Sequence, residues 1–188
     1  MKAASGAILL ALLLSACGAT QPTPQVSATP TPAQAMVGCT EPTIPPEAPV
    51  YAFFSCADGE PSDVKPVARQ AQAADPLSRL DAAMIALVGG PTEGERAAGY
   101  ISWFSEETEL AFNSVTLDDD GLAIVDLADI RQVIPNASTS AGSEMLLAQL
   151  NATAFQIDEV TAVEYRIDGS CDDFWEWVQR SCEVVRRP

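Results

Sequence analysis

The sequence predicts an α+β fold, a single compact two-layer sandwich in which helices pack on a sheet. Three observations predict it: short runs of strand-forming residues, two helical segments with one apolar side, and one Asp-Gly turn between two strand-like runs. The expected order is strand or strands, helix, hairpin, helix, strand. About 140 residues from Pro49 onward suffice for a single core.

The first strand is expected at residues 50–56, where Val, Tyr and Phe residues precede the turn signal Asp58-Gly59. A short second strand at residues 64–69 is expected to pair with it. Because Pro66 lacks a backbone N–H, this second strand should lie at a sheet edge.

The first helix is expected to follow Asp75, which is a favourable N-cap residue and precedes Pro76 at the first helical position. Gly89-Gly90-Pro91 should end it. One face of the helix is apolar and should pack on the core; its residues are Leu77, Leu80, Met84, Leu87 and Val88.

A hairpin is expected from residues 110–117 and 122–127, which surround Asp118-Asp119-Asp120-Gly121. The apolar alternation slips by one near Asn113-Ser114, which indicates a bulge.

The acidic composition of this turn also suggests a calcium-binding loop. Counted as an EF-hand loop from Thr116, position twelve is Leu127, where a bidentate glutamate is required. A hairpin turn is therefore predicted, and weak calcium binding stays open.

The second helix is expected to begin at Ser140 or Ser143 and to continue through Ala154, with Leu146, Leu147 and Leu150 on its apolar side. In residues 163–168, apolar and charged side chains alternate, which predicts a last strand with one solvated face.

The N-terminal residues 1–16 are typical of an export signal, with Lys2 before an apolar run of eight residues. A membrane span needs about 20 apolar residues. Leu14-Ser15-Ala16-Cys17 resembles the bacterial lipobox, which implies that Cys17 carries the lipid after cleavage. An ordinary secretory signal with a coincidental cysteine is the alternative.

Residues 17–48 are predicted to be a lipid-attached Pro/Thr-rich tether, because residues 18–49 hold eight of the fourteen prolines. Some 30 residues at about 3 Å each allow a reach of roughly 90 Å. Residues 49–188 form the expected domain, with a core at 50–169 and a tail at 170–188.

The four cysteines after Cys17 are Cys39, Cys56, Cys171 and Cys182. An even number in an exported domain predicts two disulfides, with three possible pairings. Short loops favour Cys39 with Cys56 and Cys171 with Cys182. A four-thiolate zinc site is less consistent with the wide spacing, and no metal site is expected.

The second pairing restricts the segment between its cysteines. Eleven residues of continuous helix would separate the Cα atoms by about 16 Å, whereas a disulfide allows about 7 Å. The segment must therefore turn back, with at most a short helix at residues 172–178.

Aromatic side chains concentrate in this segment, at Phe174, Trp175 and Trp177. They are candidates for contact with a partner protein or for stacking on carbohydrate. The competing interpretation is a cap, in which Phe174, Val178 and one tryptophan cover the sheet.

The composition excludes several functions. The chain has 26 acidic and 10 basic side chains, no histidine and a net charge of -16. Without an imidazole, neither a Ser-His-Asp nor a Cys-His nucleophile nor a histidine-ligated zinc can form within this chain. Few Lys and Arg side chains argue against nucleic-acid binding.

An enzyme would need other groups. Glu106, Glu107 and Glu109 could supply the paired carboxylates of a glycan hydrolase, although a solvated acidic loop is the simpler interpretation. Ser102 or Ser105 would need Lys65 as its base. No cofactor is expected.

The landmarks together resemble a lipoprotein with a GerMN domain, the module of the spore germination protein GerM. The matching pieces, in order, are Val50-Tyr51-Ala52-Phe53-Phe54, Leu87-Val88-Gly89-Gly90-Pro91-Thr92, Val125-Asp126-Leu127, Leu147-Ala148-Gln149-Leu150 with Thr153, and Val160 through Gly169. The run Thr153-Ala154-Phe155-Gln156 departs from the family pattern.

The resemblance implies a compact α/β domain that makes protein contacts and has no known catalytic residues. We therefore expect a non-catalytic, lipid-anchored protein on the outer face of the bacterial cell membrane. Its partner would be an envelope protein or peptidoglycan. The alternative is a lipid-anchored, carboxylate-based hydrolase of cell-wall glycan.

Overall fold

The computed structural model describes residues 39–40 and 49–188. The predicted signal, Cys17 and all of the predicted tether except residues 39–40 lie outside the described residues. Among those described, no helix combines the length and apolarity needed to cross a membrane.

The elements in chain order are β1 (Pro49–Cys56), β2 (Val64–Gln70), α1 (Pro76–Val88), α2 (Glu93–Ala97), β3 (Tyr100–Ile101), η1 (Glu106–Thr108), β4 (Phe112–Leu117), β5 (Leu122–Leu127), η2 (Pro135–Ser138), α3 (Ser140–Phe155), β6 (Ala162–Ile167), α4 (Cys171–Trp177) and β7 (Val185–Arg186).

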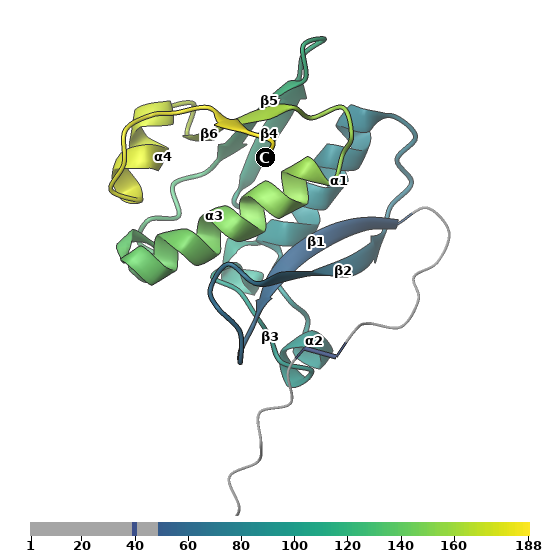
Figure 1. Cartoon of the computed structure of the whole chain (residues 1–188), viewed down its shortest axis with the longest axis vertical. Helices are drawn as coiled ribbons and strands as arrows, with labels where there is room; N and C mark the ends of the chain where they lie inside the picture. The colour runs from purple at the N-terminus through teal and green to yellow at the C-terminus, as the bar shows by residue number, and fades with distance from the viewer. Residues whose placement is uncertain (1–38, 41–48) are drawn as a thin grey trace, which may run out of the picture. The chain divides into compact units, whose positions relative to one another are not determined.

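The predicted α+β class is confirmed, and the strands divide over two sheets, ordered β2-β1-β3 and β4-β5-β6-β7 (Figure 1). β2 lies at an edge, as its proline predicts, with Pro66 opposite Phe53. β5 and β6 run parallel because α3 forms the connection between them, whereas the other strand pairs are antiparallel.

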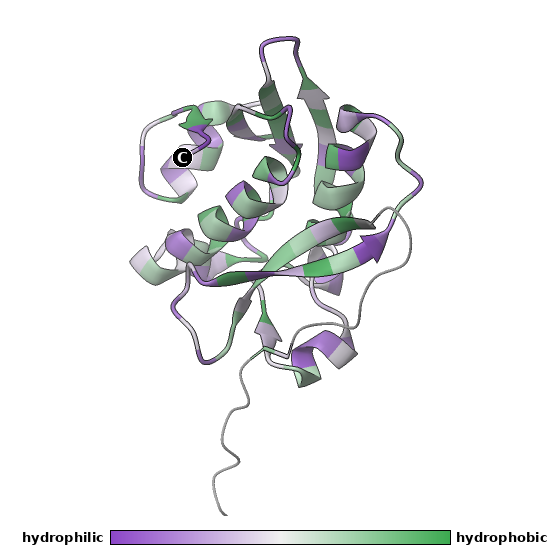
Figure 2. Ribbon diagram, turned by 45° about the vertical axis from the view of Figure 1, so that its right-hand side comes forward, coloured by the Kyte–Doolittle hydropathy of each residue, from purple (hydrophilic) through white to green (hydrophobic). Residues whose placement is uncertain are grey.

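The β4–β5 hairpin forms where Asp-Gly predicts it, and its tip is hydrophilic (Figure 2). The register shifts between Phe112 and Ser114, which confirms the predicted bulge. Asp118 stabilises the turn, because its Oδ1 accepts hydrogen bonds from the backbone N–H groups of Asp120 and Leu122 at 3.0 and 2.8 Å.

Helix α1 begins and ends as predicted. The Asp75 side chain accepts a hydrogen bond from the Ser78 N–H at 3.0 Å, and Gly89 is the C-cap. Gly90 follows with a φ of 71°, where a Cβ atom would lie 2.3 Å from the Phe104 carbonyl oxygen. Only glycine allows the loop before η1 to pack this closely on the end of α1.

The main core lies between α1, α3 and the inner faces of the sheets. Fully buried members include Phe54, Leu80, Met84, Leu87, Val125, Leu146, Leu150 and Tyr165. Leu77 departs from the prediction, since 40% of it is exposed. It lies in the first turn of α1 and lines a shallow pocket beside Leu117 and Gly121, at the end of the hairpin.

Candidate functional site

The aromatic cluster of α4 is part of the core, which corrects its interpretation as a partner-contacting surface. Phe174 and Trp175 are fully buried and Trp177 is 8% exposed. The ring centroids of Phe174 and of Tyr165 on β6 lie 5.2 Å apart, and both tryptophan rings pack edge to face against Phe174. The competing interpretation, a cap over the sheet, describes these side chains.

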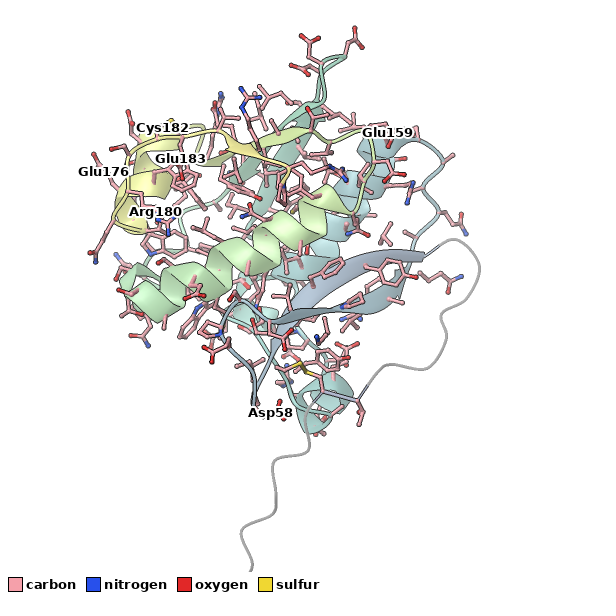
Figure 3. All side chains as sticks on the ribbon, in the orientation of Figure 1. Asp58, Glu159, Glu176, Arg180, Cys182 and Glu183 are labelled. Carbon is pink, nitrogen blue, oxygen red and sulfur yellow. A yellow bond between two sulfur atoms is a disulfide. The ribbon has the colours of Figure 1, made fainter. Side chains whose placement is uncertain are left out.

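The Cys171–Cys182 disulfide holds this cap in place. Its Cα atoms lie 5.5 Å apart, because α4 ends after seven residues and the chain turns back through Gln179, whose φ is 61°. Figure 3 places the labelled Arg180, Cys182 and Glu183 on this returning segment, beside α4. The short helix that the sequence predicts at residues 172–178 is therefore present.

A second disulfide, Cys39–Cys56, attaches Cys39, which lies within the predicted tether, to β1, again with Cα atoms 5.5 Å apart. The neighbouring Thr40 donates its N–H to Ala98 O at 3.4 Å, and Tyr100 donates its hydroxyl to Thr40 O at 3.1 Å. Both bridges thus join cysteines across the short loops that the sequence favours.

Polar side chains of α3 and of its C-cap residue bond to the edge of β1. Gln156 accepts a hydrogen bond from the Tyr51 N–H at 2.8 Å, and Thr153 accepts one from the Phe53 N–H at 3.1 Å. This edge of β1 pairs with β3 only at its end, so the helix supplies the partners that a strand would otherwise supply. The departure Thr153-Ala154-Phe155-Gln156 in the family pattern therefore includes two residues that bond β1.

The candidate serines and lysine are engaged in other contacts. Ser102 donates its hydroxyl to Gln149 Oε1 at 2.6 Å, and Ser105 caps η1 by accepting a hydrogen bond from the Glu107 N–H. Lys65 forms an ion pair with Asp63 at 2.8 Å.

The three candidate carboxylates, Glu106, Glu107 and Glu109, are exposed on and beside η1. They line none of the three pockets described below. Within residues 39–40 and 49–188, no group of three or more acidic, histidine or cysteine side chains converges as a metal site would require.

The surface of the described domain has several hollows, of which three bear on function. One of about 440 Å³ lies between the start of α3 and the loop after α4, and one of about 310 Å³ lies between α1 and the hairpin tip. The third, of about 680 Å³, crosses the outer face of α3, and we call it the α3 groove. It is lined by Ser62, Val64, Ala148, Asn151, Ala152, Phe155, Val185, Arg186, Arg187 and Pro188.

The α3 groove has an apolar floor and a basic rim. Ala148, Ala152 and Phe155 form the floor, whereas Arg186 and Arg187 lie at the rim that β7 provides. Arg187 donates hydrogen bonds to the carbonyl oxygens of Ile157 and Val160, and its guanidinium lies 5.7 Å from the Phe155 ring centroid. Sequence reasoning missed this site, because no local pattern indicates that the C-terminal arginines return to α3.

Comparison with known proteins identifies the domain. A family model described as Germane, sporulation and spore germination, matches residues 49–172. No curated protein matches the chain at a significant level.

Two solved structures are similar. One contains the tandem GerMN domains of the sporulation protein GerM from Bacillus subtilis, with 19% identity and a TM-score of 0.50 over 74% of this chain. The match covers 44% of the GerM chain, less than half of its length. The other is a Clostridium perfringens protein described as a candidate lipoprotein, with 17% identity, a TM-score of 0.40 and coverage of 65% of this chain and 74% of that one.

At this identity the likeness to GerM concerns the fold, which agrees with the GerMN resemblance of the sequence landmarks. The family model covers more than half of the 188 residues. The chain therefore belongs to the Germane family, the family of sporulation and spore germination domains.

Proposed function

We propose that this chain is a non-catalytic, lipid-anchored protein of the bacterial cell envelope, whose Germane domain makes contacts with an envelope partner. The main support for this proposal is the family match over residues 49–172. The surroundings of the candidate catalytic side chains support the proposal. Ser102 and Ser105 form internal hydrogen bonds, and Lys65 forms an ion pair with Asp63. The glutamates of the η1 region are exposed.

The lipid anchor rests on the sequence Leu14-Ser15-Ala16-Cys17 after an apolar run. Dual or triple acylation of one cysteine gives stable membrane attachment, whereas a single acyl chain is marginal. The proline-rich residues 18–38 then separate the lipid from Cys39, where the disulfide to Cys56 begins the folded domain.

Replacement of Cys17 tests the anchor. The Cys17→Ser variant should move from the membrane fraction to the soluble fraction, and metabolic labelling with a radioactive fatty acid should no longer label the protein. Cys39→Ser with Cys56→Ser serves as the control, because it removes two other cysteines, joined in a disulfide, and leaves Cys17 in place. Retention of Cys17→Ser on membranes would contradict the anchor.

The contact function is tested by crosslinking in living cells with a photoreactive amino acid placed at exposed domain positions. We expect covalent adducts with a defined envelope protein or with wall peptide, formed by the wild type and abolished when the domain is unfolded. A purified domain that hydrolyses wall glycan, with the activity lost in a Glu106→Gln, Glu107→Gln, Glu109→Gln variant, would replace the proposal by the hydrolase alternative.

A further inference from the structure

Helix α3 is apolar on two sides. Leu146, Leu150 and Ala154 are fully buried in the core, while Ala148, Ala152 and Phe155 on the outer side are only half-buried. From Met145 to Ile157 the sequence has no charged residue. A helix whose outer side faces water ordinarily carries charged residues there, and one that is apolar all round is ordinarily covered.

The described domain covers this outer side incompletely. The turn at Ser62 and Val64 lies along one side, and Val185 to Pro188 lie along the other, which leaves the α3 groove of about 680 Å³ between them. Figure 1 shows the C-terminal segment returning from α4 and ending near α3. From Ala148 to Phe155 the floor extends about 10 Å, at 1.5 Å per helical residue, which matches two turns of a docked helix or three to four residues of a strand.

The rim of the groove on the β7 side carries positive charge. Neither Arg186 nor Arg187 forms an ion pair within the described part of the chain, since the bonds of the Arg187 guanidinium go to neutral carbonyl groups. The chain as a whole has a net charge of -16, so the two adjacent arginines make this part of the surface positive in a protein that is otherwise acidic. They favour an anionic occupant.

The opposite side of the groove has the other sign. Ser62, which lines the groove, donates its hydroxyl to Glu144 at 2.8 Å, so a carboxylate lies behind this wall. An occupant with acidic residues at one side only would therefore bind in one orientation, with its carboxylates toward β7.

We infer that the α3 groove docks an acidic amphipathic segment of a partner protein. The apolar side chains of this segment cover Ala148, Ala152 and Phe155, and its carboxylates pair with Arg186 and Arg187. The inference rests on the proposed function, that the domain makes contacts with an envelope partner, and it names the surface and the chemistry of that contact.

The test uses the full-length protein in the cells that make it, with a photoreactive phenylalanine derivative at Ala152 in the groove floor. The same residue at Leu110, which is 92% exposed, and at Ile85 on the outer side of α1 provides two positions outside the groove. The crosslinked peptide is sequenced by mass spectrometry. We expect it to come from another protein and to carry apolar residues next to Asp or Glu.

Charge exchange then tests the recognition. Arg186→Glu should lower the Ala152 crosslink about tenfold, and Lys replacements of the acidic residues in the captured segment should restore it. Arg186→Gln should give a smaller loss and keeps the inference testable if charge reversal disturbs folding. Arg79→Glu, on α1 and outside the groove, changes the net charge equally and should leave the crosslink unchanged.

The outcomes separate the two proposals. Crosslinks to a partner at Leu110 or Ile85, but none at Ala152, would overturn the groove inference and leave the proposed function intact. Absence of crosslinks at all three positions would contradict both. A crosslink from Ala152 to a second copy of this chain, to its own residues 18–48, or to a segment whose capture is insensitive to Arg186→Glu would also overturn the inference.

Discussion

Gln149 of α3 donates a hydrogen bond from its side-chain amide to Ser55 Oγ of β1 at 3.0 Å, and both residues are completely buried. The same amide nitrogen donates to Ile101 O at 3.2 Å, while Oε1 accepts from Ser102. The Gln149 side chain of α3 thus joins β1, β3 and the loop that follows β3.

Replacement of Gln149 by Leu should therefore destabilise the domain. The apolar side chain leaves the buried hydroxyl of Ser55 and the Ile101 carbonyl with fewer partners, which typically costs about 1–3 kcal/mol. Urea unfolding followed by tryptophan fluorescence measures the loss. Gln70→Leu, at the exposed end of β2, is the matched control and should change the stability by no more than about 0.5 kcal/mol.

Trp175→Ala should be strongly destabilising, by about 3–5 kcal/mol, because the indole is fully buried against Phe174. Thermal unfolding monitored by circular dichroism measures the shift. Leu110→Ala removes an apolar side chain that is 92% exposed and should be nearly neutral. A Trp175→Ala variant that keeps its stability and loses partner binding would restore the contact interpretation of α4.

Removal of the Cys171–Cys182 bridge should loosen the α4 cap. The double variant Cys171→Ala, Cys182→Ala should lose about 2–3 kcal/mol of stability, because the bridge closes a short loop in the unfolded chain. Near-ultraviolet circular dichroism should show weaker tryptophan bands, since two of the three tryptophans, Trp175 and Trp177, belong to the cap.

The other bridge provides the comparison for this variant. Cys39→Ala with Cys56→Ala should lower the stability by a similar amount, since its loop is also short. It should weaken the tryptophan bands less, because this bridge joins Cys39 to β1 and does not hold α4, which carries Trp175 and Trp177. Identical spectra for both double variants would contradict the assignment of the cap to Cys171–Cys182.

The Asp129 carboxyl should have an unusually low pKa. Hydrogen bonds from the Arg131 guanidinium, at 2.8 and 2.7 Å, and from its backbone N–H lower the pKa of Asp129 from 3.8 to about 2. Arg131→Gln should return this pKa most of the way to 3.8, as measured by carbon-13 NMR titration of the carboxyl group. Arg79→Gln should leave it unchanged.

The stability effect of this pair follows from the sign of the shift. A lowered folded-state pKa contributes stability that is present above about pH 3.8 and is lost as the pH falls toward about 2. The pair is exposed, so the contribution is small. The difference in Tm between wild type and Arg131→Gln should therefore be small near neutral pH and should vanish near pH 2.

Elements with local signals were predictable from the sequence. Asp75-Pro76 determines the start of α1, and Asp118 with Gly121 determines the hairpin turn, because capping and turn hydrogen bonds join residues two to four positions apart. Pro66 likewise excludes an inner position for β2. The two short-loop disulfides belong to this class as well.

Features that depend on distant contacts were not predictable in this way. An amphipathic pattern does not reveal whether Trp175 and Trp177 face a partner or the sheet, and only their packing beside Phe174 and Tyr165 decides it. Leu77 fits the apolar face of α1 by spacing, yet its turn extends beyond the core. The division into two sheets depends on parallel pairing of β5 with β6 across the whole of α3.

By itself, the sequence determined the order of the main strands and helices and the caps and turns of α1 and the β4–β5 hairpin, while α2, β3 and β7 were not predicted. It also determined the family resemblance and, as a prediction, the export and lipid-attachment signal, because each depends on neighbouring residues or on a linear pattern. Only the tertiary structure decided that the aromatic cap is buried and that Arg186 and Arg187 reach the outer face of α3. The physical reason is that burial and charge at a surface depend on which segments meet in space, and the C-terminal arginines meet α3 from about 30 residues away in the chain.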